Sequence, residues 1–314
     1  MLEVIRAIQK AKSVLIVTHT DPDGDAIGSM LAMCLALKGS GRKISMYCRD
    51  KVPEIYKFLP QSDKVKHSIS KVKFDIAIAV DCGGENRVGK GIKLKALADA
   101  VINIDHHPDN TEFGDINFIE KISSVSEILF RLFSEMGIRI TKEIAACLYA
   151  GIMTDTGNFR YDYTTARTLD TAAFLARAGA DISGIAMAIY ESKTKSSVKV
   201  LGAAMYRLET SKSGKVAWTI LPQKLMDSIG AKSEDLTGLV DQIRSIKGVE
   251  VAVLFREEDD RIKVNFRSKF KVNVSDIAKK LGGGGHIRAS GAILQGSLEN
   301  AKDKVLAEVF KVIK

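Results

Sequence analysis

The chain of 314 residues is poor in cysteine and contains no long apolar run. Its cysteines lack the C-x-x-C spacing of a zinc or redox site, so we interpret them as buried free thiols. They are Cys34, Cys48, Cys82 and Cys147. No apolar stretch is long enough to span a bilayer, and the first residues lack the layout of a signal peptide. We therefore expect a cytoplasmic protein without a membrane partner.

The glycine run at residues 282–285 is not a P-loop, because no Gly-Lys-Ser/Thr sequence follows it. The sequence also has no internal repeat and no low-complexity segment. With 46% hydrophobic and 27% charged residues, the composition is ordinary for a globular protein, and the length allows two domains. The net charge of +9 suits an anionic substrate, but it equally suits a merely basic protein.

Short apolar strands alternate with helices in the N-terminal part of the chain. Strands are expected at residues 14–17, 43–48, 74–80 and 101–104, and helices at residues 2–11, 26–38, 123–136, 142–156, 165–178 and 182–192. Such alternation is typical of an α/β fold with a doubly wound, mostly parallel sheet. In these sheets ligands bind at the carboxyl ends of the strands. We assign residues 1–188 to this domain.

The pattern changes after residue 192. A polar, cationic stretch at residues 193–200 indicates a linker region, which we place at residues 189–205 and which continues as helix through about residue 208. The remainder, residues 206–314, is expected to form a smaller α/β domain. Its strands are predicted at residues 215–221, 249–256, 261–267 and 292–295, and its helices at residues 274–281 and 298–313.

An acidic turn containing His19, Asp23 and Asp25 follows the first predicted strand. In extended or turning backbone, residues two apart can point to the same region, while Asp21 points elsewhere. Groups this crowded repel one another unless a cation lies among them. The alternative is a plain turn with a helix N-cap, since Asp, Pro and Gly are favoured there for backbone reasons; Asp25 would then be that cap.

Polar residues also follow later buried elements, and each has a structural alternative. Asp81, which follows the third strand, and Asp155, which ends an apolar helix, are on their own explained as caps. Asp105, His106 and His107 follow the fourth strand, where adjacent imidazoles offer metal ligation and proton donation; a structural pair is the alternative. Because the fold brings most of these ends to one edge, together they indicate divalent cations. Oxygen and imidazole ligands without thiolate favour manganese or magnesium over structural zinc.

The C-terminal part carries a second group of candidate residues. Four successive glycines at residues 282–285 let backbone N–H groups approach an anion closely, and His286 follows them directly. Arg267 and Lys269 supply positive charge for a phosphate or carboxylate. A flexible turn is the alternative explanation of the glycines.

These motifs resemble those of a known family. His19-x-x-x-Asp23-x-Asp25, then Asp81, then Asp105-His106-His107, then Asp155 resemble the four ordered motifs of the DHH phosphoesterase family. The run from Gly282 through His286 to Gly291 is similar to the hallmark of that family's DHH-associated C-terminal nucleic-acid-binding domain. Together they cover nearly the whole chain. Its length resembles the small, nanoRNase-like branch, which degrades very short oligoribonucleotides and dephosphorylates pAp (adenosine bisphosphate).

The resemblance implies roles for individual residues. It implies that one metal ion is held by His19 and Asp23, that a second is held by Asp25, His106 and Asp155, and that Asp81 bridges the two. Asp105 would orient its neighbouring histidine, and His107 would contact the scissile phosphate and help protonate the leaving oxygen. The residues implied in substrate binding are Arg267, Ser268, Gly283, Gly284, Gly285 and His286, with Arg87 and Asn110 as further candidates.

The expected function is therefore hydrolysis of phosphoester bonds by a hydroxide that two divalent ions, Mn²⁺ or Mg²⁺, activate. The implied substrates are short single-stranded RNA or DNA oligonucleotides, dinucleotides included, and pAp. The alternatives are a linear or cyclic dinucleotide phosphodiesterase, a single-strand exonuclease, an inorganic pyrophosphatase and a non-catalytic nucleic-acid-binding module. The glycine-rich loop before His286 argues against the pyrophosphatase, and intact ligands at every motif argue against the non-catalytic module. Whether the protein is a homodimer is left open.

Overall fold

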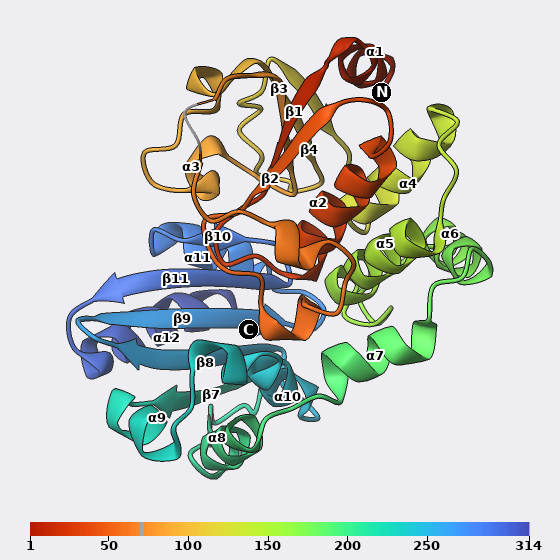
Figure 1. The fold of residues 1–314 in the computed structure, drawn as a ribbon. Coiled ribbons are helices and arrows are strands. Elements are labelled where there is room, and N and C mark those ends of the chain that lie inside the picture. The colour runs from red at the N-terminus through yellow and green to blue at the C-terminus, as the bar shows by residue number, and fades with distance from the viewer. Residues whose placement is uncertain (70–71, 314) are drawn as a thin grey trace. The chain divides into compact units, whose positions relative to one another are not determined.

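The computed structural model describes residues 1–69 and 72–313, and the chain divides into two units, Met1–Ser192 and Lys193–Lys314 (Figure 1). The boundary falls within the region predicted as a linker, but that region contains helix α8 (Lys195–Tyr206). The assignment of residues 1–188 and 206–314 as functional domains stays a prediction, and its last residue, Lys314, lies outside the described residues.

Within the described residues, a five-stranded parallel sheet forms the centre of the first unit. Its strands are β1 (Ser13–Val17), β2 (Lys43–Tyr47), β3 (Phe74–Val80), β4 (Ala98–Asp105) and β5 (Ile116–Ile119), in the order β2-β1-β3-β4-β5. The chain leaves β1 toward β2 on one side and returns to β3 on the other, so the strand order reverses between β1 and β3. This reversal is the point at which parallel α/β sheets bind ligands.

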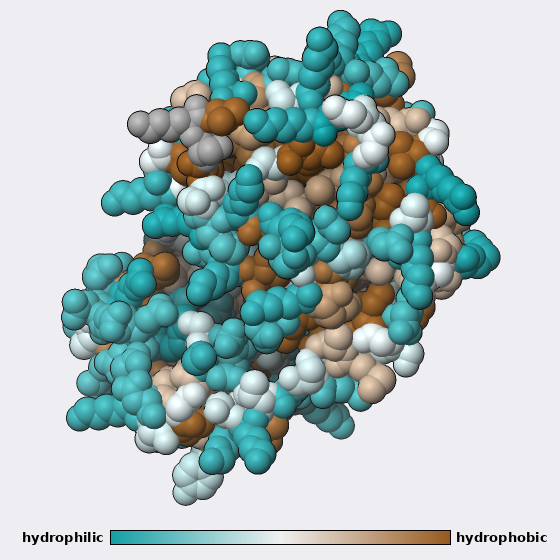
Figure 2. Space-filling model, in the orientation of Figure 1, coloured by the Kyte–Doolittle hydropathy of each residue, from teal (hydrophilic) through white to brown (hydrophobic). Residues whose placement is uncertain are grey.

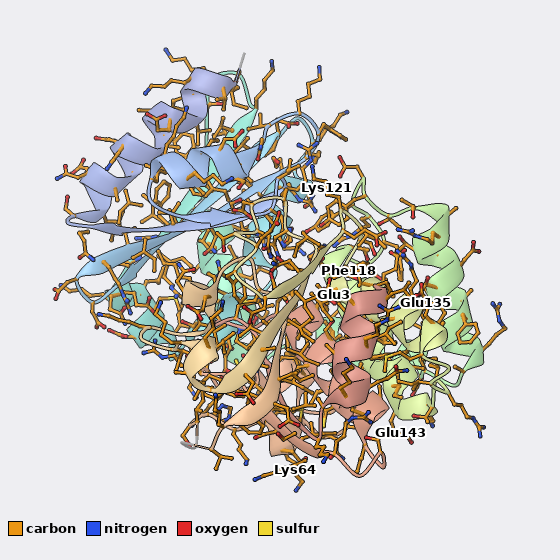
Figure 3. All side chains as sticks on the ribbon, turned by 90° about the horizontal axis from the view of Figure 1, so that it is seen from above. Glu3, Lys64, Phe118, Lys121, Glu135 and Glu143 are labelled. Atoms are coloured by element: carbon orange, nitrogen blue, oxygen red, sulfur yellow. The ribbon has the colours of Figure 1, made fainter. Side chains whose placement is uncertain are left out.

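The longer helices of the first unit share one hydrophobic core with one face of this sheet. They are α1 (Leu2–Lys10), α2 (Gly24–Leu37), α4 (Val125–Glu135), α5 (Lys142–Asp155), α6 (Ala166–Arg177) and α7 (Ile182–Tyr190). Polar side chains at the N-caps of α4 to α7 accept backbone N–H groups of the first turn, which fixes where each helix begins. Helix α1 lies beside β5, where Glu3 and Phe118 are labelled in Figure 3.

Alternate residues of each strand enter different cores. Ile16 and Ile78 point to the face covered by helices, where α2 and α5 are buried. Leu15 and Ala77 point to the opposite face, which packs against short elements between β3 and β4. Those elements are α3 (Glu85–Val88) and the 3₁₀ helix η3 (Leu94–Ala96), while two further 3₁₀ helices, η1 (Glu54–Tyr56) and η2 (Ser62–Lys64), lie between β2 and β3.

The second unit is built on a mixed sheet whose described strands have the order β10-β11-β9-β8-β7-β6. They are β6 (Glu209–Thr210), β7 (Val216–Leu221), β8 (Val251–Glu258), β9 (Arg261–Ser268), β10 (Gly284–Gly285) and β11 (Ala289–Gln295). Only the β7–β8 pair is parallel among these described strands. β8 and β9 form a hairpin, in which β8 reaches two residues closer to the turn than expected and β9 begins at Arg261 as expected.

Helices cover both faces of the second sheet. They are α8, α9 (Gln223–Ile229), α10 (Leu239–Ser245), α11 (Val274–Lys280) and α12 (Leu298–Val312), with a 3₁₀ helix, η4, at Ser233–Leu236. Phe255 and Phe266 pack against α11 and α12 on one face. Leu254 packs against α8, α9 and α10 on the other. The fold class is confirmed as mixed α/β, with a parallel sheet in the N-terminal unit and a second sheet in the C-terminal one.

Large apolar side chains that remain exposed are spread over many elements. The face seen in Figure 2 is accordingly covered mainly by hydrophilic residues, with small apolar groups between them. Within the described residues no single helix is both long and apolar enough to cross a membrane. One bent pair, α6 with α7 at 110°, passes the same test by length and composition.

Candidate metal centre

Three strand ends and one helix end come together at the point where the strand order reverses. His19 lies two residues beyond β1, Asp81 directly follows β3, and His106 directly follows β4. Asp155 is the last residue of α5. His106 Nε2 lies 3.5 Å from Asp81 Oδ1 and 3.3 Å from Asp155 Oδ2. Residues up to 136 positions apart in the sequence (155 − 19) therefore share one buried site, as the parallel sheet predicts.

Asp81 lies between the imidazoles of His19 and His106. Its Oδ2 is 3.6 Å from His19 Nε2, and its Oδ1 is 3.5 Å from His106 Nε2. Its backbone has a φ of +55°, in the left-handed region that costs a non-glycine residue about 1–3 kcal/mol. The Asp81 N–H still donates to Ile104 O at 3.1 Å, so the strand ladder holds this conformation in place.

Backbone carbonyls fix the tautomers of the two facing histidines. His19 Nδ1 lies 2.8 Å from Thr20 O, and His106 Nδ1 lies 3.0 Å from Ile122 O. A carbonyl can only accept, so each Nδ1 carries a proton and donates it. In the neutral imidazoles the lone pair is then on Nε2, which faces the carboxylates. This is how proteins commonly orient a histidine that binds a metal ion.

The carboxylates and imidazoles fall into groups whose ligand atoms lie within 4.8 Å of one another: His19, Asp23 and Asp81; Asp25, His106 and Asp155; and Asp81, Asp105 and His107. The first two groups match the two ligand sets that the resemblance implies. Asp81 Oδ1 and Asp155 Oδ2 are buried and accept no hydrogen bond from the described part of the chain. Buried carboxylate oxygens without donors, next to imidazole nitrogens, fit a pair of divalent cations.

Burial and the neighbouring charges shift the pKa values of these groups. Burial opposes a charge on His19, but Asp81 and Asp23 outweigh it and raise its pKa to about 9. Burial and the charge of Asp81 raise the pKa of Asp25 to about 7. Burial resists ionisation of Asp81, but the facing imidazoles of His106 and His19 hold its pKa well below the usual value. Without metal, protons on the imidazoles therefore balance part of the buried negative charge.

Asp23 and Asp25 are held differently, although they are two residues apart. Asp23 is the N-cap of α2, and its Oδ1 accepts the N–H groups of Asp25 and Ala26 at 3.1 and 3.0 Å. The cap is thus Asp23 rather than Asp25. Asp25 is buried, and its two oxygens accept N–H groups from the first turn of α4. Asp21 is exposed.

A glycine lets α5 approach this carboxylate. A Cβ on Gly151 would lie 2.7 Å from Asp25 Oδ1 and would overlap Ser126 Oγ. Side-chain atoms at that separation require a shift of the backbone or of the aspartate itself. Gly151 therefore sets the distance between α5, which carries Asp155, and the start of α4.

The backbone turns sharply after Asp155. Gly157, Asn158 and Phe159 follow with φ values of +58°, +61° and +59°. Tyr163 then folds back, and its hydroxyl donates to the backbone carbonyl of Asp155 at 2.8 Å. The loop thus holds the C-terminal end of α5 at the site.

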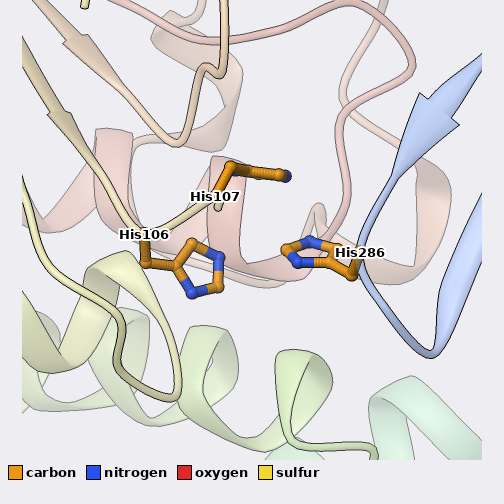
Figure 4. Close-up of side chains that lie close together, drawn as sticks. All are labelled: His106, His107 and His286. Carbon is orange, nitrogen blue, oxygen red and sulfur yellow. The ribbon is translucent and has the colours of Figure 1, made fainter. Parts of the chain in front are cut away.

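His107 leaves the end of β4 in a different direction from His106 (Figure 4), with the two rings 5.1 Å apart at 73°. His107 Nδ1 lies 2.8 Å from Asp105 Oδ1, so the carboxylate fixes the ring and its tautomer. Asn110 Nδ2 donates to the other oxygen of Asp105 at 2.5 Å and to Asn103 Oδ1 at 2.8 Å. Asn110 therefore supports Asp105; its predicted contact with substrate stays a prediction.

Several residues of the site were not identified from the sequence. Asn103 is buried within β4, and Ser29 and Ser126 flank Asp25. No sequence motif marks these three residues, because each contacts a residue that lies outside its own element. Arg87, which was a candidate, is exposed; its backbone carbonyl accepts the Thr20 N–H at 2.7 Å, and its charge acts against the proton on His19.

The second unit brings its own candidates together. Ser268, at the end of β9, pairs through its N–H with Arg288 O at 3.1 Å, so β9 lies beside the turn that contains His286. Arg267 Nε lies 3.5 Å from Asp241 Oδ1. Gly285 has a φ of +133°, and a Cβ there would lie 2.7 Å from Ala289 O, so the turn itself requires this glycine. His286, also labelled in Figure 4, closes that turn through hydrogen bonds with Ala289.

Comparison with known proteins decides the family. The DHH family N-terminal domain matches residues 13–152, and the DHHA1 domain matches residues 213–314. The chain is 33% identical to the bifunctional oligoribonuclease and PAP phosphatase NrnA of Thermus thermophilus, over 98% of this chain and 91% of that relative. The chain belongs to the DHH phosphoesterase family. It is therefore a hydrolase of phosphoester bonds, and the predicted family and enzyme class are confirmed.

Two solved structures show the same DHH architecture. An exopolyphosphatase-related protein from Bacteroides fragilis is 28% identical, with a TM-score of 0.90, over 98% of this chain and 95% of that one. Exonuclease RecJ bound to manganese is 13% identical, with a TM-score of 0.52, over 97% of this chain and 93% of that one, and shares the fold. DHH phosphoesterases are metal-dependent, and the cluster around Asp81 is the candidate for their metal site in this chain.

Proposed function

We propose that this DHH phosphoesterase hydrolyses very short single-stranded oligonucleotides, dinucleotides included, and removes a phosphate from pAp. The observation that supports metal-dependent hydrolysis is the position of Asp81. Its two oxygens face the imidazoles of His19 and His106, which belong to two separate ligand groups. The naming of the Thermus thermophilus relative as an oligoribonuclease and PAP phosphatase supports the substrate class. The chain covers nearly the whole of that relative.

The ligand sets follow from the groups that the fold assembles. His19 and Asp23 would hold one cation, Asp25, His106 and Asp155 the other, and Asp81 would contact both. The chemistry that two bound divalent cations supply is polarisation of the phosphate and activation of a water molecule at neutral pH. Because the donor set is oxygen and imidazole, we propose Mn²⁺, with Mg²⁺ as the other candidate.

His107 is the proposed general acid. Its Nδ1 is engaged with Asp105, which leaves Nε2 to carry the proton that a leaving oxygen needs. Asp105 orients this imidazole, and the Asn110 amide holds Asp105 in turn. The pair resembles other carboxylate–histidine pairs, in which the carboxylate orients the ring and does not itself transfer the proton.

The second unit is the proposed substrate-binding domain. Within this unit the Ser268 hydroxyl is buried, and the N–H groups of Gly283 and His286 already donate to Ala278 O and Ala289 O at 2.8 Å each. The charge of Arg267 at the end of β9 and the imidazole of His286, beside Gly284 and Gly285, are the groups proposed to meet the ligand. These groups suit a terminal phosphate or a nucleotide. We further infer a cytoplasmic location, and Arg87 remains a candidate for substrate contact within the first unit.

A substrate panel tests the proposal. Purified protein with Mn²⁺ is assayed on pAp, a linear dinucleotide, a cyclic dinucleotide, longer single-stranded DNA and pyrophosphate, each with and without EDTA. We expect chelator-sensitive hydrolysis of pAp and the linear dinucleotide, with far slower cleavage of the others. Preferential cleavage of pyrophosphate, cyclic dinucleotide or long DNA would contradict the proposal.

A further inference from the structure

One short segment, residues 122–126, holds two candidate ligands of the same cation. Ile122 O accepts the proton of His106 Nδ1 at 3.0 Å. Three and four residues later, the N–H groups of Val125 and Ser126 donate to Asp25 Oδ2 and Oδ1 at 2.6 and 3.0 Å. A shift of this segment would therefore move a carboxylate and an imidazole together.

The other candidate cation position does not depend on this segment in the same way. The tautomer of His19 is fixed by its neighbour Thr20, at 2.8 Å. Asp23 is fixed by the first turn of α2. The two ligand groups thus have separate supports, and a perturbation of residues 122–126 falls on the group of Asp25, His106 and Asp155.

The segment is anchored by a buried glutamate, Glu127. Its side chain is fully buried and accepts hydrogen bonds from Ser123 Oγ and, at 2.9 Å each, from Thr168 Oγ1 and Arg167 Nε. The Ser124 hydroxyl in turn accepts the Glu127 N–H at 3.2 Å, so two successive residues in the middle of the segment are tied to Glu127. A buried carboxylate with all its donors in place resists movement, because separation would leave charge unpaired.

We propose that Glu127, paired with Arg167, is a positioning residue that holds residues 122–126 so that Asp25 and His106 are preset for the second cation. This inference rests on the proposed metal centre. Glu127 itself contacts neither ligand; it acts through Ser123 and the backbone of the α4 N-terminus. The helix α6, which supplies Thr168 and Arg167, is thereby coupled to the affinity of one metal position and not of the other.

The test is Glu127→Gln, compared with Glu120→Gln as a matched control. Glu120 also pairs with Arg167 and with Arg131, at 3.4 and 2.6 Å, but it makes no side-chain bond to residues 122–126 among the described contacts. Mn²⁺ binding is followed by electron paramagnetic resonance and calorimetry. Partners behind a metal ligand typically change affinity about 10- to 100-fold, so we expect Glu127→Gln to weaken one of two Mn²⁺ sites about 10-fold.

Glu120→Gln should bind Mn²⁺ at both sites with wild-type affinity. In Glu127→Gln the Mn²⁺ affinity of the remaining site should equal that of wild type. Activity of Glu127→Gln on a dinucleotide should recover when the Mn²⁺ concentration is raised, since the ligands themselves are intact. A purely structural role predicts instead a lower midpoint of thermal unfolding with both Mn²⁺ affinities equal to wild type. That outcome, or equal weakening of both sites, would overturn the inference.

A second pair of variants covers the case in which Glu127→Gln does not fold. Thr168→Val removes one donor to Glu127 without a change of charge, and Thr168→Ser keeps the hydroxyl. We expect weakening of the same single Mn²⁺ site in Thr168→Val and none in Thr168→Ser; equal binding in both would also overturn the inference. If wild-type protein binds two Mn²⁺ ions but cleaves none of the substrates, the proposed function fails while these binding comparisons still decide the role of Glu127.

Discussion

The carboxylate of Asp81 faces the imidazole of His106, with Asp81 Oδ1 3.5 Å from His106 Nε2. These residues directly follow neighbouring parallel strands, β3 and β4, so the relationship follows from the sheet itself. The other oxygen of Asp81 is 3.6 Å from His19 Nε2, beyond the end of β1. The Asp81 side chain therefore lies between an imidazole that follows β1 and one that follows β4, on the two sides of β3.

Replacement of Asp81 by Asn should abolish metal-dependent hydrolysis and leave the fold intact. Asparagine tolerates the left-handed backbone at φ +55° but cannot supply a negative charge to two cations. Two-metal stabilisation is worth several kcal/mol, so kcat/KM on a dinucleotide should fall by about 10³-fold or more. Asp21→Asn is the control, because Asp21 has a φ of +57° and is exposed. Comparable activity in the two variants would exclude a bridging role for Asp81.

Asp105→Asn should slow turnover without a loss of bound metal. The amide can present its NH₂ group to His107 Nδ1, so the proposed acid would lose the orientation and tautomer that the carboxylate fixes. General acid catalysis contributes about 10²–10⁴-fold, so kcat should fall within that range while KM and Mn²⁺ stoichiometry change little. Steady-state kinetics at saturating Mn²⁺ measures kcat and KM, and metal analysis measures the Mn²⁺ stoichiometry. A variant that loses Mn²⁺ instead would place Asp105 among the ligands.

Metal binding should release protons near neutral pH. The pKa of His19 is raised to about 9 in the metal-free site, so its imidazole is charged at pH 7.5, and a ligand must be neutral. The pKa of His106 is raised as well. In calorimetry at pH 7.5, Mn²⁺ binding should be more exothermic in Tris than in PIPES, because Tris takes up the released protons with more heat. Equal heats in the two buffers would show that the imidazoles are already neutral.

Gly151→Ala should destabilise the protein and disturb the second metal position. The added Cβ would lie 2.7 Å from Asp25 Oδ1, and overpacking of this kind costs about 1–3 kcal/mol. Gly202→Ala is the opposite control, since a Cβ there meets nothing within 4 Å inside helix α8. That change should stabilise the protein by up to about 1 kcal/mol. Urea unfolding measures the free energy of unfolding of both variants. Equal changes of this free energy would mean that the approach of α5 to Asp25 is not tight.

The part of the site that could be predicted from the sequence lies at the ends of buried strands. Apolar runs before His19, Asp81 and Asp105 predict parallel strands, and parallel strands place their carboxyl ends at one edge. The side-chain groups observed at that edge follow from this rule without any knowledge of the loops. Strand β5 was not predicted, because its four residues, Ile116–Ile119, are only half-buried and form the edge of the sheet.

Contacts between distant polar groups could not be predicted. Ser124-x-x-Glu127 has the sequence of a capping box, which predicts that the glutamate bonds its own helix end. Instead, its carboxylate accepts hydrogen bonds from Ser123 and from two residues of α6. These are Thr168 and Arg167, which lie 41 and 40 positions later in the sequence. Likewise Asp25 is held by α4, 100 positions later. Such pairs depend on how helices pack, and nothing local in the sequence marks them.

Anomalous diffraction from crystals grown with Mn²⁺ tests the central claim most directly. The account predicts two manganese peaks in each chain, both beside Asp81. One should lie among His19 and Asp23, and the other among Asp25, His106 and Asp155. A single peak, or manganese bound away from Asp81, would contradict it.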